Sequence, residues 1–91
     1  MSANDSGREV TLITAADCHL CEHARNVLGS IASDFPLIIA ELPWDSDQGR
    51  LLVTRDDVAF PPAVYVDGSL AGYGRISERA LRRRLAEPNR S

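Results

Sequence analysis

The spacing of apolar residues along the chain predicts alternating strands and helices, separated by polar or glycine- and proline-containing breaks. Both faces of residues 8–14 are largely apolar or small, which favours a central strand covered on both sides. Residues 18–33 carry apolar side chains at helical spacing, which predicts an amphipathic helix. The predicted elements, in order, are strand 8–14, helix 18–33, strand 36–42, helix 47–54, strand 63–66, strand 69–72 and helix 77–86.

Local signals mark where the later elements begin and turn. Asp45 and Ser46 are candidate N-caps for the second helix, and Ser77 is the candidate cap for the last one. The Asp67-Gly68 pair is a strong hairpin signal between the last two strands. The side chains expected to face the core from the two shorter helices are Leu51, Leu52, Ile76, Ala80, Leu81 and Leu85.

Length and composition predict one small soluble domain. The chain has 91 residues, and its 44% hydrophobic and 25% charged residues are ordinary for a globular protein. The expected organisation is a disordered N-terminal tail at 1–7, one domain at 8–87 and a C-terminal tail at 88–91. The polar start has no signal-peptide pattern and no apolar run approaches the roughly 20 residues of a membrane span, so a cytoplasmic protein without a membrane partner is expected. The net charge of −3, with ten arginines and no lysine, argues against nucleic acid as the partner. The protein is expected to be a monomer.

Candidate chemistry is concentrated at Cys18 and Cys21, the only two cysteines of the chain. Their C-x-x-C spacing falls where the first strand gives way to the first helix, which indicates a thiol–disulfide redox site. Half of a zinc site, an iron–sulfur ligand set and an inert pair are the alternatives. A reducing cytosol disfavours a structural disulfide, and such a short ring would restrict the unfolded chain very little.

Helical geometry makes the two cysteines unequal. The apolar stripe of the first helix consists of Leu20, Ala24, Val27, Leu28 and Ile31. Cys21 falls beside this stripe and Cys18 well away from it, while His19 and His23 fall on the solvent side. An attacking thiol needs access and a resolving thiol needs only to reach its neighbour, so Cys18 is the expected nucleophile and Cys21 the resolver. Because these cysteines and histidines project to different sides, no metal site within one chain is expected.

Four motifs in order resemble the glutaredoxin-like branch of the thioredoxin-fold superfamily, and most closely its short bacterial members with Cys-His-Leu-Cys. The motifs are Cys18-His19-Leu20-Cys21, Asp45-Ser46-Asp47, Pro62-Ala63-Val64-Tyr65-Val66-Asp67-Gly68 and Gly72-Tyr73-Gly74. The resemblance covers residues 8–86 and implies an α/β thioredoxin-like fold, β-α-β-α-β-β-α, with a four-stranded mixed sheet flanked by helices.

The resemblance also implies roles for residues around the dithiol. Pro62 matches the family's cis proline, which packs beside the dithiol; in a register shifted by one, Pro61 would be the cis residue and Phe60 the docking residue. The candidate substrate-docking residues are Pro61, Pro62 and Tyr73.

Two residues beside the cysteines are candidates for tuning the thiolate. Asp17 could cap the first helix or oppose the thiolate by its charge, and protonated His19 would favour the thiolate. Arg55 or Arg75 could hold a glutathione carboxylate where the family uses lysine.

The function predicted from these features is that of a thiol–disulfide oxidoreductase of glutaredoxin-like type, acting in cell redox homeostasis. No tightly bound cofactor is expected, with glutathione as a candidate co-substrate and a disulfide-containing protein or a small thiol as the substrate. The alternative functions are a metal or iron–sulfur carrier, including a cluster bridged between two chains, and a thioredoxin-fold binding module with an idle dithiol.

Overall fold

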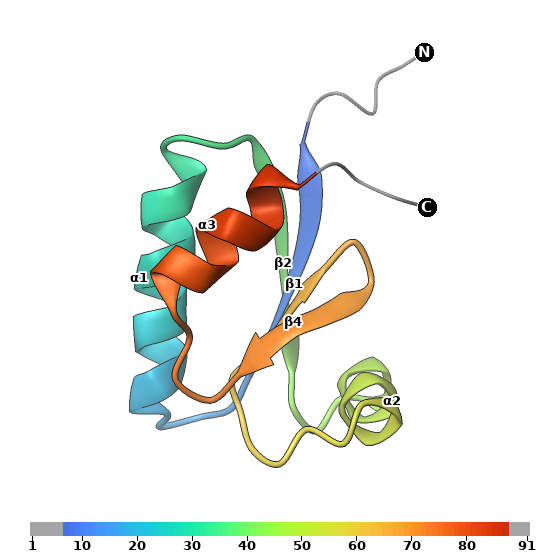
Figure 1. Ribbon diagram of the computed structural model, residues 1–91. Helices are drawn as coiled ribbons and strands as arrows, with labels where there is room; N and C mark the ends of the chain where they lie inside the picture. Colours follow the sequence, from blue (N-terminus) through green and yellow to red (C-terminus); the bar gives the residue numbers. More distant parts are fainter. Residues whose placement is uncertain (1–6, 88–91) are drawn as a thin grey trace.

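The centre of the molecule is a four-stranded mixed sheet with the strand order β2-β1-β3-β4. The computed structural model describes residues 7–87, so the predicted tails lie outside the described residues apart from Gly7. Strand β1 runs parallel to β2 and antiparallel to β3, and β3 pairs with β4 as an antiparallel hairpin (Figure 1). The elements are β1 Arg8–Thr14, α1 His19–Ala32, β2 Leu37–Pro43, α2 Asp47–Arg55, β3 Ala63–Val66, β4 Ser69–Tyr73 and α3 Glu78–Ala86. The predicted order and type of every element are confirmed.

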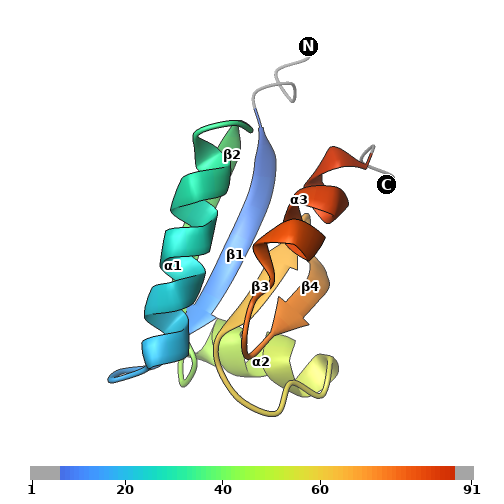
Figure 2. The same ribbon diagram turned by 60° about the vertical axis from the view of Figure 1, so that its left-hand side comes forward.

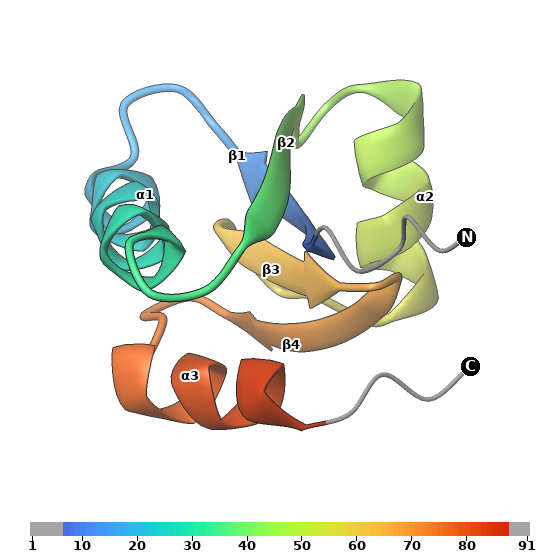
Figure 3. The same ribbon diagram turned by 90° about the horizontal axis from the view of Figure 1, so that it is seen from above.

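Helices cover both faces of the sheet, with α1 and α3 on one face and α2 on the other (Figure 3). The alternation of side chains along β1 explains this arrangement, because Val10 and Leu12 enter the core under α1 and α3 while Ile13 enters the smaller core under α2. The expectation that this strand is central and covered on both sides is therefore confirmed. No helix within residues 7–87 has the length and apolar character to cross a membrane.

Ser46, not Asp45, is the cap of α2, and the predicted cap Ser77 and the predicted hairpin turn are confirmed. Ser46 Oγ accepts the Gly49 N–H at 3.0 Å, and Ser77 Oγ accepts the Ala80 N–H at 3.1 Å. In the hairpin, Asp67 and Gly68 have φ angles of 49° and 87°, the left-handed conformation that a tight turn between two strands requires.

Ionic contacts hold distant segments together. Arg8, at the start of β1, reaches Asp67 with Nε 2.6 Å from Oδ2 and donates to the Leu85 carbonyl at 3.0 Å. One arginine thus ties the hairpin turn to the end of α3. Arg82, in α3, bridges Asp34 at 2.9 Å and Glu78 at 3.0 Å.

Two predictions about the inward faces of the short helices are wrong. Leu51 is 71% exposed, whereas Val53 is buried. The reason is Gly49, which packs so closely on the Pro43 carbonyl that no Cβ would fit, so the inward face of α2 carries positions 49 and 53 and Leu51 lies opposite. Ala80 is also exposed, because α3 turns Leu81 toward the sheet instead.

The placement of His23 on the solvent side is wrong as well. Its ring is half-buried, with Nε2 3.1 Å from the Ile76 carbonyl oxygen. The segment that leads into α3 passes along this side of α1, and periodicity within α1 alone does not reveal that neighbour.

Matched leucine truncations test the orientation of the helices. Leu28→Ala, at a position 1% exposed on α1, should lower the free energy of unfolding by about 3 kcal/mol. The same truncation at Leu51 should change it by less than about 0.5 kcal/mol. Urea denaturation measures both, and an equal loss at the two positions would contradict the described packing.

The buried phenol of Tyr65 predicts a loss of stability at high pH. Burial, with the nearby Asp56 carboxylate, raises the pKa of Tyr65 from 10.0 to about 12. Its hydroxyl donates to the Leu52 carbonyl at 3.0 Å. Because the unfolded chain releases this proton first, the stabilisation is complete below pH 10 and is lost as the pH rises toward 12. Tyr65→Phe should lower the free energy of unfolding by about 1 kcal/mol at neutral pH and reduce its decline above pH 10, both measured by urea denaturation. If the free energy of unfolding of this variant declined as steeply as that of the wild type, groups other than Tyr65 would cause the loss.

Candidate functional site

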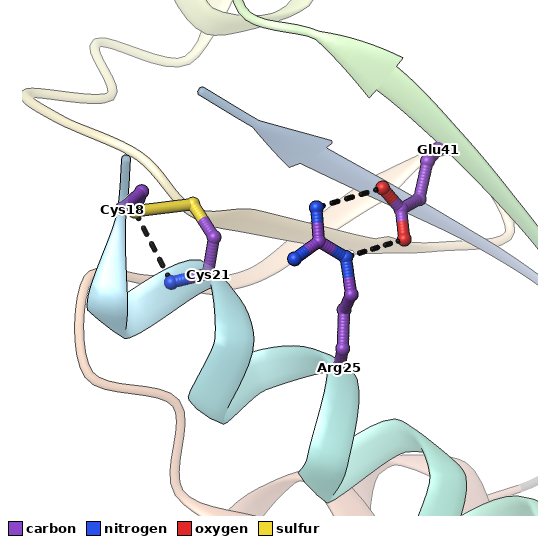
Figure 4. The surroundings of a disulfide bond; sticks show 4 residues. All are labelled: Cys18, Cys21, Arg25 and Glu41. Atoms are coloured by element: carbon purple, nitrogen blue, oxygen red, sulfur yellow. Dashed lines mark hydrogen bonds and ion pairs between the residues drawn. A yellow bond between two sulfur atoms is a disulfide. The ribbon is translucent and has the colours of Figure 1, made fainter. Parts of the chain in front are cut away.

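Cys18 is the N-cap residue of α1 and is joined to Cys21 by a disulfide (Figure 4). Its backbone is extended, with φ −117° and ψ 106°, and its carbonyl accepts the N–H groups of Cys21 at 3.1 Å and Glu22 at 3.2 Å. Its Sγ accepts the Cys21 N–H at 3.1 Å. A sulfur therefore takes the place that a Ser or Asp oxygen usually occupies at a helix start.

The two cysteines differ in access, as predicted. Cys21 is 0% exposed and packs with the apolar side of α1, whereas Cys18 is only partly buried. Their Cα atoms are 5.2 Å apart. Cys18 also lies at the positive end of the helix dipole, where unpaired N–H groups favour a thiolate.

The prediction that Asp17 caps α1 is wrong. Asp17 lies one residue too early, exposed in a turn with φ 53°, and the cap is Cys18 itself. His19 is the first residue of α1 and is exposed. Both flank Cys18 in sequence, and their tuning of a thiolate there stays a prediction.

The loop that precedes β3 lies at the same end of the sheet as Cys18. Its Pro61-Pro62 peptide bond is cis, which confirms Pro62 as the cis residue, in place of Pro61. Ala63 pairs with Ile13 near the end of β1, so Pro62 faces the segment that leads into α1. The loops before α1, before β3 and before α3 all gather at this end (Figures 1 and 2).

An aromatic pair forms part of the surface at this end. The rings of Phe60 and Tyr73 meet edge to face, with centroids 5.5 Å apart at an angle of 83°, and both side chains are exposed. Gly74, which has φ 78° and donates its N–H to the Pro62 carbonyl at 2.8 Å, lets the Phe60 ring approach within 2.9 Å of where a Cβ would stand. Tyr73 thus lies beside the proline loop, and its pairing with Phe60 was not predicted from the sequence.

A cleft of about 560 Å³ opens at the carboxyl ends of β1 and β2, lined by residues 14–16, Arg25 and residues 41–45. Arg25 and Glu41 form a two-pronged pair in it, with Nε–Oε2 at 2.8 Å and Nη2–Oε1 at 3.2 Å (Figure 4). The hydrogen bond and charge of Glu41 raise the pKa of Arg25. Arg25 lies four residues after Cys21, so helical spacing alone could have placed the two on the same side of α1. Glu41 reaches Arg25 only because β2 pairs with β1, where Glu41 lies opposite Leu12.

The two arginines expected near a glutathione carboxylate differ in availability. Arg55 is engaged, with Nη2 2.7 Å from Asp56 Oδ2 and 3.0 Å from the Gly68 carbonyl oxygen. Arg75 is exposed in the turn after Gly74 and lines a small pocket with Tyr73. Within residues 7–87, no group of three or more His, Cys, Asp or Glu side chains is arranged to hold a metal ion.

Comparison with solved structures identifies the architecture. A point-mutant thioredoxin from Halobacterium salinarum matches with a TM-score of 0.63 and 21% identity, over 89% of this chain and 74% of that one. The chain has a thioredoxin-like fold. Mitochondrial thioredoxin 3 from Saccharomyces cerevisiae, in its oxidized form, matches this thioredoxin-like chain at a TM-score of 0.61 and 18% identity, over 88% of this chain and 77% of that one. No protein-family model and no curated protein matches the chain, so its activity has to be argued from the site.

The unequal exposure of the dithiol predicts selective alkylation. After reduction at neutral pH, iodoacetamide should modify Cys18 and leave Cys21 unmodified, because only the Cys18 thiol is accessible and stabilised as a thiolate. Peptide mass spectrometry of the briefly treated protein measures each site. Equal labelling of the native protein would contradict the assignment, and equal labelling in urea serves as the positive control.

Proposed function

We propose that this protein is a thiol–disulfide oxidoreductase of glutaredoxin-like type, with Cys18 as the nucleophile and Cys21 as the resolving thiol. The observation that carries the proposal is the asymmetry of the dithiol: a partly exposed cysteine caps α1, and a buried one follows it with 5.2 Å between the Cα atoms. The thioredoxin-like fold supports a redox role in general terms.

The proposed reaction begins with the reduced protein. The Cys18 thiolate attacks one sulfur of a substrate disulfide, which forms a mixed disulfide and releases the other substrate sulfur as a thiolate that takes up a proton. Cys21 then loses its proton and attacks Cys18 Sγ, so the second substrate thiol leaves and the Cys18–Cys21 disulfide forms. Two electrons pass from the dithiol to the substrate, and an external thiol or a reductase returns them.

The start of α1 supports the first step. The Cys21 N–H that reaches Cys18 Sγ at 3.1 Å is a donor aimed at the sulfur on which negative charge develops. Asp17 and His19 act in opposite directions in this proposal, the carboxylate disfavouring the thiolate and a protonated imidazole favouring it.

Substrate docking is assigned to the loop and turn at the same end of the sheet. Pro61, Pro62 and Tyr73 would contact the chain that flanks the substrate disulfide, and Phe60 extends Tyr73 into an apolar surface. Pro61 has no N–H, so it can offer a bound strand only its carbonyl. We propose a protein disulfide or a small-thiol disulfide as the substrate.

The glutaredoxin-like type and the use of glutathione rest on the sequence motifs. Glutathione as a co-substrate needs a cation for its carboxylates, and Arg75 fits better than Arg55 because Arg55 already binds Asp56 and the Gly68 carbonyl. In the proposed cytoplasmic setting, such a thiol pool would return electrons to the dithiol.

Single cysteine variants test the mechanism. Cys18→Ser should lower disulfide reduction to the uncatalysed rate, because the attacking thiolate is gone. Cys21→Ser should keep the first step and accumulate a mixed disulfide, which intact-mass spectrometry detects as an added substrate mass. Full turnover by both variants would refute the mechanism.

The same preparation separates the proposal from a carrier function. A protein that carries metal or an iron–sulfur cluster would show metal content and visible absorbance when purified without oxygen, and both signals would fall in Cys18→Ser. An idle dithiol would show neither these signals nor turnover.

A further inference from the structure

Strand β2 forms one edge of the sheet (Figure 3), and most of its residues are exposed. It pairs with β1 over seven consecutive residue pairs without a register shift. Ile38 is 52% and Ile39 is 42% exposed, although they point to opposite faces of the sheet. A long, regular, apolar edge strand is a template for pairing with another strand.

Two hydrogen bonds show which backbone groups of β2 face outward. The Pro36 carbonyl accepts the Arg8 N–H at 3.1 Å, and the Trp44 N–H donates to the Thr14 carbonyl at 2.7 Å. In a parallel pair, alternate residues bond to the neighbouring strand, so the even-numbered residues of β2 face β1. The N–H and C=O groups of Leu37, Ile39 and Glu41 therefore point away from the sheet.

The opposite edge, β4, is protected against such pairing. Its pairing with β3 is interrupted by an irregularity at Val64 and Tyr65, and bulges disfavour edge-to-edge contact. Arginine side chains also occupy carbonyls there: Arg84 donates to Leu70 at 3.4 Å, and Arg55 donates to Gly68 at 3.0 Å. Strand β2 has neither device.

The charge of the β2 edge also permits a second copy. Glu41 is the only charged residue of Leu37–Pro43, and Arg25 of the same chain already pairs with it. Two copies of this strand can therefore approach without the like-charge repulsion that an unpaired carboxylate would cause.

We propose that β2 pairs antiparallel with β2 of a second copy of this chain, with the two-fold axis at Ile39. Ile39 then faces its own copy, and Leu37 faces Glu41 of the other chain. Each of these pairs exchanges two hydrogen bonds through its outward groups. An axis at Ala40 would instead set Leu37 against Pro43, which has no N–H to donate.

The side chains and the helices fit this register. Ile38 of one chain lies beside Ala40 of the other on the face away from α1, where both are exposed in the single chain. With strands roughly 4.8 Å apart, β1 and its copy are roughly 14 Å apart, and α1 and its copy lie side by side on the same face of the joined sheet. On α1, the side that carries Arg25 continues with the small residues Gly29 and Ala32, which allow a close approach.

The pairing leaves both redox sites open. Because the two β2 strands run in opposite directions, the Cys18 ends of the two chains lie at opposite ends of the joined sheet. The dimer replaces the sequence-based expectation of a monomer, and it does not depend on the proposed redox function.

Light scattering across a range of protein concentrations tests the proposal. The wild-type chain should be a dimer at about 100 μM, and Ile39→Lys, which sets two ammonium groups on the axis, should raise the dissociation constant at least about a hundredfold. Ile39→Pro, which removes an outward N–H and the isoleucine side chain but no hydrogen bond to β1, should do the same. Leu51→Lys, on the exposed side of α2, is the matched control and should leave the dimer intact.

Amide hydrogen exchange supplies a second readout. In the dimer the amides of Leu37, Ile39 and Glu41 should be protected, and Ile39→Lys should increase their exchange at least about tenfold while Ile38 and Ala40 keep their protection from β1. A wild-type chain that is monomeric at about 1 mM, a dimer that survives Ile39→Lys, or a monomer that captures an extended peptide along β2 would each overturn the proposal. Unchanged turnover per subunit in Ile39→Lys shows that the redox site is intact and keeps the two hypotheses separate.

Discussion

The end of strand β1 is the constraint on which the rest of the structure depends. The Thr14 carbonyl accepts the Trp44 N–H at 2.7 Å, which fixes the end of β2. Ile13 pairs with Ala63, which fixes the start of β3 beside cis Pro62. The chain then turns through residues 15–17 and begins α1 at the Cys18 cap. One strand end thus positions a cleft, a proline loop and a helix start together. The cap sulfur belongs to this framework and is also the group proposed to react.

Periodicity predicted the architecture well because the apolar positions of β1 and α1 show which of their faces other elements cover. Strand β1 is apolar on both faces since it is central, and α1 has a continuous apolar stripe since it covers one core. The same reasoning failed where an orientation depends on a contact between elements. Leu51 was expected to face inward, but the close approach of Gly49 to Pro43 turns α2 the other way. No periodicity within α2 contains that information.

The site could be predicted only as far as local geometry extends. The angle between positions 18 and 21 on a helix is enough to separate an accessible thiol from a buried one. The backbone conformation of Asp17 does not follow from helical spacing, and its φ of 53° excludes it from the cap position. The pairing of Arg25 with Glu41 and of Phe60 with Tyr73 joins segments that only the folded sheet brings together.

The cations that brace this fold are all guanidinium groups, as at Arg8–Asp67, Arg25–Glu41 and Arg82–Glu78. A guanidinium keeps its charge up to a pH of about 12, whereas a thiol ionises near 8.5. The chain has no lysine, so no side-chain ammonium group titrates in that interval. The ion pairs that brace the fold therefore keep their charges while the dithiol loses its protons. A change in its redox equilibrium with pH then has to come from the two sulfurs and from groups beside them such as His19, and not from the bracing ion pairs.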